Sequence, residues 1–164
     1  MLKEPYRLKE FVSRAKPFAG RLFTCARPGR SKGSTKKSIG DEVVRAWIGG
    51  LPNCRPLHIV SLLGRKPPPS GLSEYSYYSF RGGHENRKSP TFQDWLDVNF
   101  AASGFKVTEF PTIDLRRIDD RDMAEICDYI RSLLKSSVNV LIVDSGGFTR
   151  TRSVCAALGA EEKI

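Results

Sequence analysis

The stretch DSGGFTRT, residues 144–151, holds the side chains and backbone groups in this chain that are best suited to chemistry. It follows the apolar run VNVLIV, whose β-branched residues predict a buried strand. A strand of this kind delivers its loop to the carboxyl edge of an α/β sheet, where ligands usually bind. The loop is therefore the first candidate for a binding site.

The composition of this loop favours a phosphate group as the ligand. Its two glycines allow a sharp turn in which successive backbone N–H groups point inward and form an anion-binding nest. A helix predicted from about Arg150 adds its positive N-terminal end, and the planar guanidinium of Arg150 can bind two phosphate oxygens. We expect the phosphate-binding groups to come from Ser145, Gly146, Gly147, Phe148, Thr149 and Arg150.

These residues resemble the signature loop of the protein tyrosine and dual-specificity phosphatases, H-C-x-x-G-x-x-R-[ST]. Gly147, Arg150 and Thr151 match the glycine, the phosphate-binding arginine and the hydroxyl residue of that motif. Val143 stands where the motif has His, and Asp144 stands where it has the nucleophilic Cys. The resemblance implies catalytic roles for Asp144, Arg150 and Thr151, with catalysis impaired by the missing thiol.

A second match to this family lies upstream of the loop. The family's general acid is an Asp on a loop about thirty residues before the nucleophile, and EFPTID places Asp114 thirty positions before Asp144. The resemblance implies that Asp114 protonates the leaving oxygen. From the residues alone, Asp114 could instead pair with Arg116 or Arg117.

Three functions follow from these residues and stay open. The chain could be a pseudophosphatase that binds phosphate or a phosphorylated protein, or an active phosphomonoester hydrolase that uses Asp144 and Asp114 on phosphoproteins. A carboxylate attacks phosphorus far less readily than a thiolate, and aspartyl-phosphate enzymes generally need Mg²⁺. The second carboxylate that such a site expects is absent, because Gly146 occupies its position. We therefore expect neither a metal nor a cofactor.

The third function comes from the uneven distribution of charge. Residues 1–40 carry eleven Lys and Arg against two Glu, whereas the remaining 124 residues carry sixteen charges of each sign. Clustered basic side chains release counterions when they bind polyanions, so this segment could tether nucleic acid, anionic lipid or an acidic partner. The alternative is that this segment is a solvated N-terminal extension without a binding role.

The order of predicted elements indicates a three-layer α/β domain with a mostly parallel central sheet flanked by helices. We expect a basic arm over residues 1–42, with a short helix at 5–19 and a linker at 26–41, and a phosphatase-like domain over 43–164. Helices are predicted at 91–103, 119–137 and from about 150, and strands at 43–52, 56–64, 72–80, 105–111 and 138–144. One face of the sheet could be covered by the N-terminal helix or by a second subunit, as in a homodimer.

The other ionisable residues carry weaker expectations. Asp119 and Asp120 are expected to cap the helix that follows them, and His58 to be a hydrogen-bonded core residue. His84 lies in a Gly-rich loop and could reach the pocket. The four cysteines (Cys25, Cys54, Cys127 and Cys155) are scattered without metal-ligand spacing, which indicates a reducing, cytoplasmic setting. No stretch approaches the roughly 20 apolar residues of a membrane span.

Overall fold

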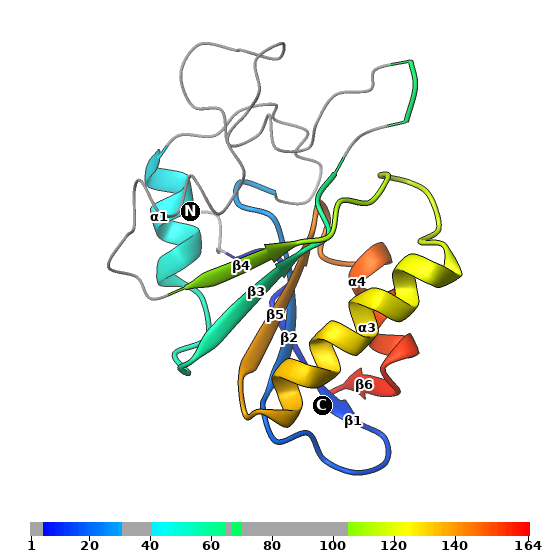
Figure 1. The fold of residues 1–164 in the computed structure, drawn as a ribbon. Helices are drawn as coiled ribbons and strands as arrows, with labels where there is room; N and C mark the ends of the chain where they lie inside the picture. The colour runs from blue at the N-terminus through cyan, green and yellow to red at the C-terminus, as the bar shows by residue number, and fades with distance from the viewer. Residues whose placement is uncertain (1–4, 31–40, 65–66, 70–104) are drawn as a thin grey trace.

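The computed structural model describes residues 5–30, 41–64, 67–69 and 105–164. Its centre is a six-stranded sheet in the order β4-β3-β5-β2-β1-β6 (Figure 1). The first four of these strands are parallel, whereas β1 is antiparallel to both of its neighbours. The strands are β1 (Lys9–Ser13), β2 (Leu22–Ala26), β3 (Leu57–Ser61), β4 (Lys106–Glu109), β5 (Asn139–Asp144) and β6 (Ala160–Glu162).

Strand β5 lies in the middle of the parallel part and positions the candidate site. All six of its residues are buried, because β3 and β2 flank it and helices cover the sheet. Asp144 ends the strand and pairs in register with Ala26 at the end of β2. The carboxyl ends of β2 and β5 therefore lie side by side at one edge of the sheet.

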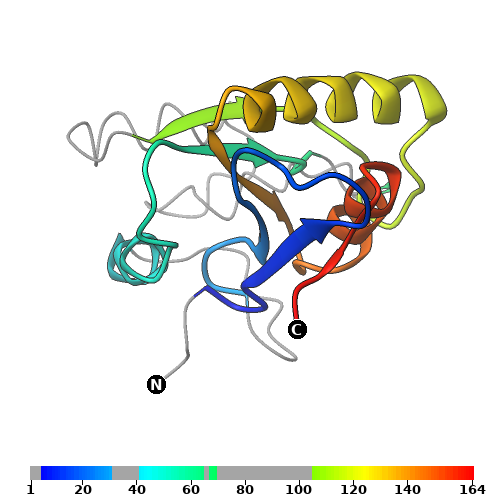
Figure 2. The same ribbon diagram turned by 90° about the horizontal axis from the view of Figure 1, so that it is seen from below.

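Helices cover both faces of this sheet (Figures 1 and 2). Helix α1 (Asp41–Gly49) lies on one face, and α3 (Asp120–Lys135) and α4 (Thr149–Ala157) lie on the other. Each face has its own apolar cluster, one around Trp47 and Leu141 and the other around Ile130 and Val140. The three-layer, mostly parallel α/β fold predicted from the sequence is confirmed.

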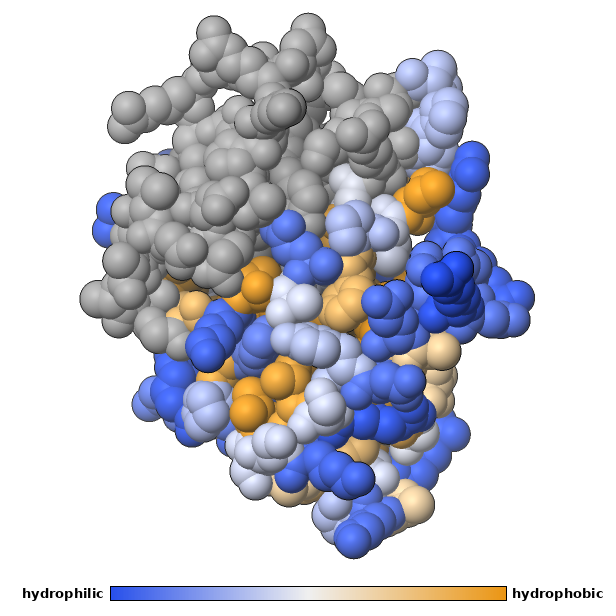
Figure 3. All heavy atoms as spheres, in the orientation of Figure 1, coloured by the Kyte–Doolittle hydropathy of each residue, from blue (hydrophilic) through white to orange (hydrophobic). Residues whose placement is uncertain are grey.

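Helix α3 begins and ends close to the predicted residues. The side chain of Asp119 accepts a hydrogen bond from the backbone N–H of Asp122 at 2.8 Å, so Asp119 is the N-cap. Asp120 lies in the first turn and Lys135 in the last, where each charge complements the helix dipole. Hydrophilic residues dominate much of the described surface in the view of Figure 3, which includes this helix.

The strand predicted over residues 43–52 is wrong, because this segment forms α1. Val44 and Trp47 follow the three-residue spacing of a helix and are buried in the cluster on this face of the sheet, together with Leu51 just after the helix. The indole Nε1 of Trp47 also donates a hydrogen bond to the carbonyl of Ala26 at 2.9 Å. A short apolar run fits a strand or a helix equally well by composition, and here its spacing decided the outcome.

The helix predicted over residues 5–19 is also wrong, because residues 9–13 form β1. Of the apolar residues at helical spacing (Leu8, Phe11, Val12 and Ala15) only Phe11 is buried, and it lies opposite Leu22 in the ladder with β2. Pairing with β2 and β6 outweighs the local helical spacing. Strands β1 and β2 thus belong to the same sheet as the elements after residue 43, and β2 itself was not foreseen.

Part of the basic N-terminal charge is paired within this sheet. Lys9 contacts Glu162 at 3.0 Å, and Arg21 binds Glu10 through two hydrogen bonds of 2.9 Å. The Arg21 guanidinium holds the pKa of the Glu10 carboxyl below its ordinary value. These pairs fix β1 against its neighbours and leave less of the charge for an external polyanion.

Some sequence predictions fall outside the described residues: the strand at 72–80, the helix at 91–103, His84 and most of the linker at 26–41. Within the described ranges, no helix combines the length and the apolar character that a membrane crossing requires.

Candidate functional site

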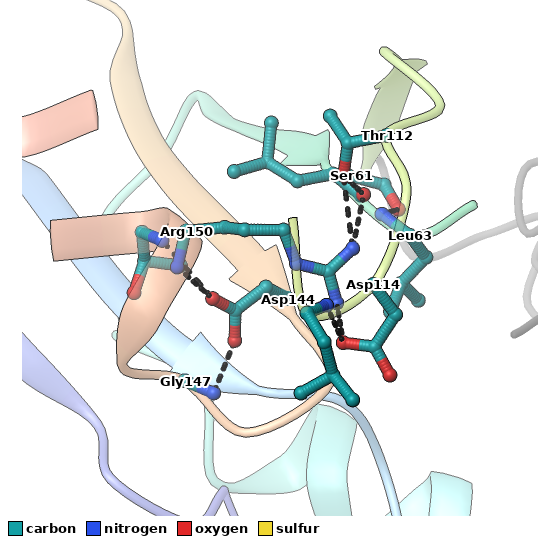
Figure 4. Close-up of polar contacts among 10 residues, drawn as sticks. Ser61, Leu63, Thr112, Asp114, Asp144, Gly147 and Arg150 are labelled. Atoms are coloured by element: carbon teal, nitrogen blue, oxygen red, sulfur yellow. Dashed lines mark hydrogen bonds and ion pairs between the residues drawn. The ribbon is translucent and has the colours of Figure 1, made fainter. Parts of the chain in front are cut away.

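The site centres on the carboxylate of Asp144, which is only 2% exposed at the end of β5. One of its oxygens accepts a short hydrogen bond from the N–H of Gly147. The other accepts hydrogen bonds of 3.0 Å from the N–H groups of Arg150 and Thr151 (Figure 4). The sequence predicted that the loop amides bind a phosphate. In the structure, the amides of Gly147, Arg150 and Thr151 instead bind the side chain of Asp144.

These contacts make Asp144 the cap of helix α4. Phe148 occupies the N-cap position and provides no capping hydrogen bond, so the first amides of the helix need another acceptor. Asp144 supplies that acceptor and places its negative charge at the positive end of the helix. The predicted cradle exists, and the side chain at the nucleophile position occupies it.

Gly147 allows the loop to lie this close to β2. Its φ is +67°, a conformation that L side chains rarely adopt. A Cβ atom at this position would lie 2.3 Å from the backbone nitrogen of Ala26. The glycine at the motif position is therefore required by the close contact between the loop and the neighbouring strand.

The Arg150 guanidinium extends toward the end of β3 (Figure 4). Its Nη1 donates to the carbonyl of Leu62 at 3.0 Å and to Oγ1 of Thr112 at 2.9 Å. Its Nη2 donates to Oδ1 of Asp114 at 3.1 Å, in a pair whose side chains are 5% and 18% exposed. Asp114 thus pairs with Arg150, and not with Arg116 or Arg117 as the sequence allowed.

The two remaining motif positions are buried. The Thr151 hydroxyl donates to the carbonyl of Phe148 at 3.3 Å, within the turn that opens α4. Val143 is fully buried in the apolar cluster on the α1 face, and its carbonyl accepts a hydrogen bond from the N–H of Leu62 at 2.8 Å. A histidine at position 143 would have to fit that apolar cluster.

A pocket of about 230 Å³ opens over the loop. It brings together Asp114, Asp144 and Arg150 with Ser145, Gly146, Phe148 and Thr149, all of which the sequence had singled out. Gly147 is buried beneath it. The pocket also contains two residues that the sequence did not assign to the site, Arg7 and Arg30, together with Leu115. Among the described residues, no cluster of three or more His, Cys, Asp or Glu side chains is arranged to hold a metal ion.

No histidine or cysteine in the described part of the chain lines this pocket. His58 lies in β3, where its Nε2 forms a 2.8 Å hydrogen bond with Thr108, and burial lowers its pKa. It is hydrogen-bonded, as expected, but half-buried rather than part of the core. Burial raises the pKa of Cys127 and raises that of Cys155 to about 12, so both thiols stay protonated near neutral pH.

The burial of these thiols gives a testable prediction. Cys25, Cys127 and Cys155 are at most 2% exposed, whereas Cys54 is partly exposed. We expect iodoacetamide at about pH 8 to alkylate one thiol per folded chain, at Cys54. Mass spectrometry of the peptides would locate the label, and all four thiols should react after unfolding in guanidinium chloride. Rapid labelling of Cys155 in the folded chain would contradict this assignment.

Comparison with known proteins shows the fold. No protein-family model matches the chain, and no curated protein sequence matches it. A kinase-associated phosphatase whose catalytic cysteine was substituted by serine matches with a TM-score of 0.60 and 21% identity, over 96% of this chain and 74% of that one. Tk-PTP in its active form matches with a TM-score of 0.47 and 19% identity, over 85% and 67% of the two chains. This chain therefore has a phosphatase-like α/β fold.

Proposed function

We propose that this chain is a phosphatase-like protein that binds a phosphomonoester or a similar oxyanion in the pocket over the loop and does not hydrolyse it. The observation that carries this proposal is the carboxylate of Asp144 bound to the amides of Gly147, Arg150 and Thr151. In the phosphatases that the loop resembles, a thiolate in this position attacks phosphorus. Here a weaker nucleophile is buried, and both of its oxygens already accept hydrogen bonds.

The pocket itself supports anion binding. Three arginines (Arg7, Arg30 and Arg150) and two aspartates (Asp114 and Asp144) line it, which gives a net positive charge. Backbone N–H groups of the loop at Ser145, Gly146 and Phe148 donate to no partner among the described residues. Guanidinium groups and unsatisfied amides at a helix N-terminus are the donors that phosphate prefers in proteins.

The test combines binding and turnover on the wild-type chain. Isothermal titration with inorganic phosphate is expected to show saturable binding, and p-nitrophenyl phosphate is expected to remain unhydrolysed under the same conditions. An absence of phosphate binding would overturn the proposal. Turnover that disappears in an Asp144→Asn variant would replace it with the alternative below.

The alternative is an active phosphomonoester hydrolase in which Asp144 acts as nucleophile or base and Asp114 as acid. One observation favours it: both carboxylates line the same pocket, and both contact Arg150, Asp144 through the backbone N–H and Asp114 through the guanidinium. If wild-type turnover is found, Asp114→Asn should slow hydrolysis while phosphate binding persists. An unchanged rate in that variant would remove Asp114 from the mechanism.

A further inference from the structure

Two arginines reach the pocket through the pairing of the N-terminal strands. Strand β1 pairs antiparallel with β2, so the residues before β1 and those after β2 lie at the same end of the sheet. The N–H of Ala26 donates to the carbonyl of Tyr6 at 2.9 Å, which fixes the segment before β1 at this edge. Because Ala26 is also the partner of Asp144, Arg7 and Arg30 arrive beside the 144–150 loop.

The side chain of Arg7 is held over the loop by several contacts. Its Nη1 donates to the carbonyl of Gly146 at 3.3 Å. Its guanidinium carbon lies 5.1 Å from the ring centre of Tyr6 and 5.2 Å from that of Phe148. Cation–π contacts of this kind orient a guanidinium without using its N–H donors. Most of these donors can therefore bind other acceptors.

These two arginines set the sign of the charge in the pocket. With Arg7 and Arg30, the lining has three positive and two negative side chains. Without them, Arg150 alone would face Asp114 and Asp144, and the pocket would be negative. A negative pocket of this size would repel a dianion, because charges at contact distance interact by several kcal/mol, roughly 4 kcal/mol at an effective dielectric constant of 20.

Asp144 occupies the amide cradle, so an anion must bind further out in the pocket. Asp144 fills the positions nearest the start of α4, and Asp114 engages the guanidinium of Arg150. We infer that Arg7 and Arg30 form the primary anion-binding site, which takes a tetrahedral phosphomonoester dianion at the mouth of the pocket, above the cradle that Asp144 fills. This inference rests on the proposed function and specifies where the anion binds.

The test uses inorganic phosphate as the probe and the full chain as the protein. Titration calorimetry would compare the wild type with Arg7→Gln, Arg30→Gln and the double variant. Each single change is expected to weaken phosphate binding about tenfold, the loss of one hydrogen-bonded charge contact, and the double change by more. A matched control removes the same charge elsewhere, in an Arg14→Gln/Arg121→Gln variant whose exposed side chains lie outside the pocket lining.

The outcomes separate this inference from the proposed function. If the wild type binds phosphate and the Arg7→Gln/Arg30→Gln variant binds it equally well, the inference is overturned and the proposed function stands. An equal loss in the control variant would also overturn it, because general electrostatic attraction would then explain the binding. If the wild type binds no phosphate, the proposed function itself fails. Arg7→Lys and Arg30→Lys, which keep the charge and lose the planar fork, guard against a folding defect and should bind with intermediate affinity.

Discussion

An Asp144→Ser variant is expected to bind inorganic phosphate at least about tenfold more tightly than the wild type, and also to be less stable. The substitution removes a negative charge from the pocket lining, and a charge at contact distance from an anion would repel it by about 4 kcal/mol at an effective dielectric constant of 20. It also frees the amides of Gly147, Arg150 and Thr151 for phosphate oxygens. Calorimetric titration of the two proteins measures the change.

The loss of stability has the same physical origin. Hydrogen bonds to a charged acceptor contribute roughly 1.5–3 kcal/mol each, but they are not additive when they share one carboxylate. Because α4 loses its cap and the serine hydroxyl can satisfy one amide, we expect the free energy of unfolding to fall by about 3 kcal/mol. Urea unfolding with and without phosphate should show that the anion restores much of this loss in Asp144→Ser, and little in the wild type.

Asp144→Asn is the matched control for this variant. It keeps the size of the side chain and one acceptor oxygen, removes the charge, and replaces the second acceptor oxygen with an NH2 group that cannot accept from a backbone N–H. Phosphate affinity between those of the wild type and Asp144→Ser would show that charge and occupied space both exclude the anion. If Asp144→Ser binds phosphate no better than the wild type, the loop amides do not face a site that an anion can enter.

The same background tests the position of the anion. Once the cradle is open, phosphate can move inward to the freed amides, and the contribution of the outer arginines should shrink. We therefore expect Arg7→Gln to weaken binding less in Asp144→Ser than in the wild type. A double-mutant cycle gives this coupling directly, because the two residues contact one ligand.

The sequence predicted the elements whose evidence is local. Strand β5 is a continuous apolar run, and α3 carries its own cap at Asp119 and its own dipole partners. The spacing from Asp144 to Arg150 lies within a single loop, so the motif and the turn could be identified together. Asp114, thirty residues before Asp144, lines the same pocket as Asp144 because β4 and β5 end at the same edge of the sheet, with β3 between them.

The parts that depend on strand pairing could not be predicted in this way. Leu8, Phe11, Val12 and Ala15 have helical spacing, and only the ladder with β2 and β6 makes residues 9–13 a strand. The same ladder brings Arg7 and Arg30 to the loop, so their place in the site followed from a register that the sequence does not state. The unusual concentration of basic residues in the first 40 positions was the available signal, and it predicted a solvated segment or a polyanion tether rather than a part of the site.

Comparison with the motif likewise could not predict which group the loop amides bind. The spacing indicated a cradle for an external anion. The structure shows another arrangement, in which Asp144 binds the backbone N–H of Arg150 while the guanidinium binds Asp114. Carboxylates and phosphates are both anions whose oxygens accept hydrogen bonds from backbone N–H groups, so the same loop amides can bind either group.

The largest change in activity is expected from Asp144→Cys. At the start of α4, next to inward-facing amides, a thiol should ionise readily, since helix N-termini lower the pKa of cysteine. The thiolate would attack phosphorus of p-nitrophenyl phosphate, the bond to the aryl oxygen would break, and water would then release phosphate from the phosphocysteine. We expect hydrolysis at least about a hundredfold above the background rate measured with the wild-type protein, the scale on which a single catalytic group changes a rate.

The design of this experiment follows from the surroundings of position 144. p-Nitrophenolate leaves without a proton, so the assay does not require Asp114 as an acid, and Asp114→Asn should affect only substrates with poorer leaving groups. Asp144→Ser serves as the control, because it opens the cradle equally and lacks the thiolate. Val143→His, which would complete the motif, is left out of the first test because position 143 is fully buried in an apolar cluster.

The result also decides how much of the site is complete apart from its nucleophile. Turnover in Asp144→Cys with none in Asp144→Ser would show that the amides and the nearby arginines can stabilise a transferring phosphoryl group. If Asp144→Cys binds phosphate tightly and remains inactive, the hydrogen bonds of the Arg150 guanidinium to Leu62, Thr112 and Asp114 hold it away from the reacting group. Arg150 would then belong to the structure of the loop, and anion binding would rest on the amides and on Arg7 and Arg30, which lie before β1 and after β2.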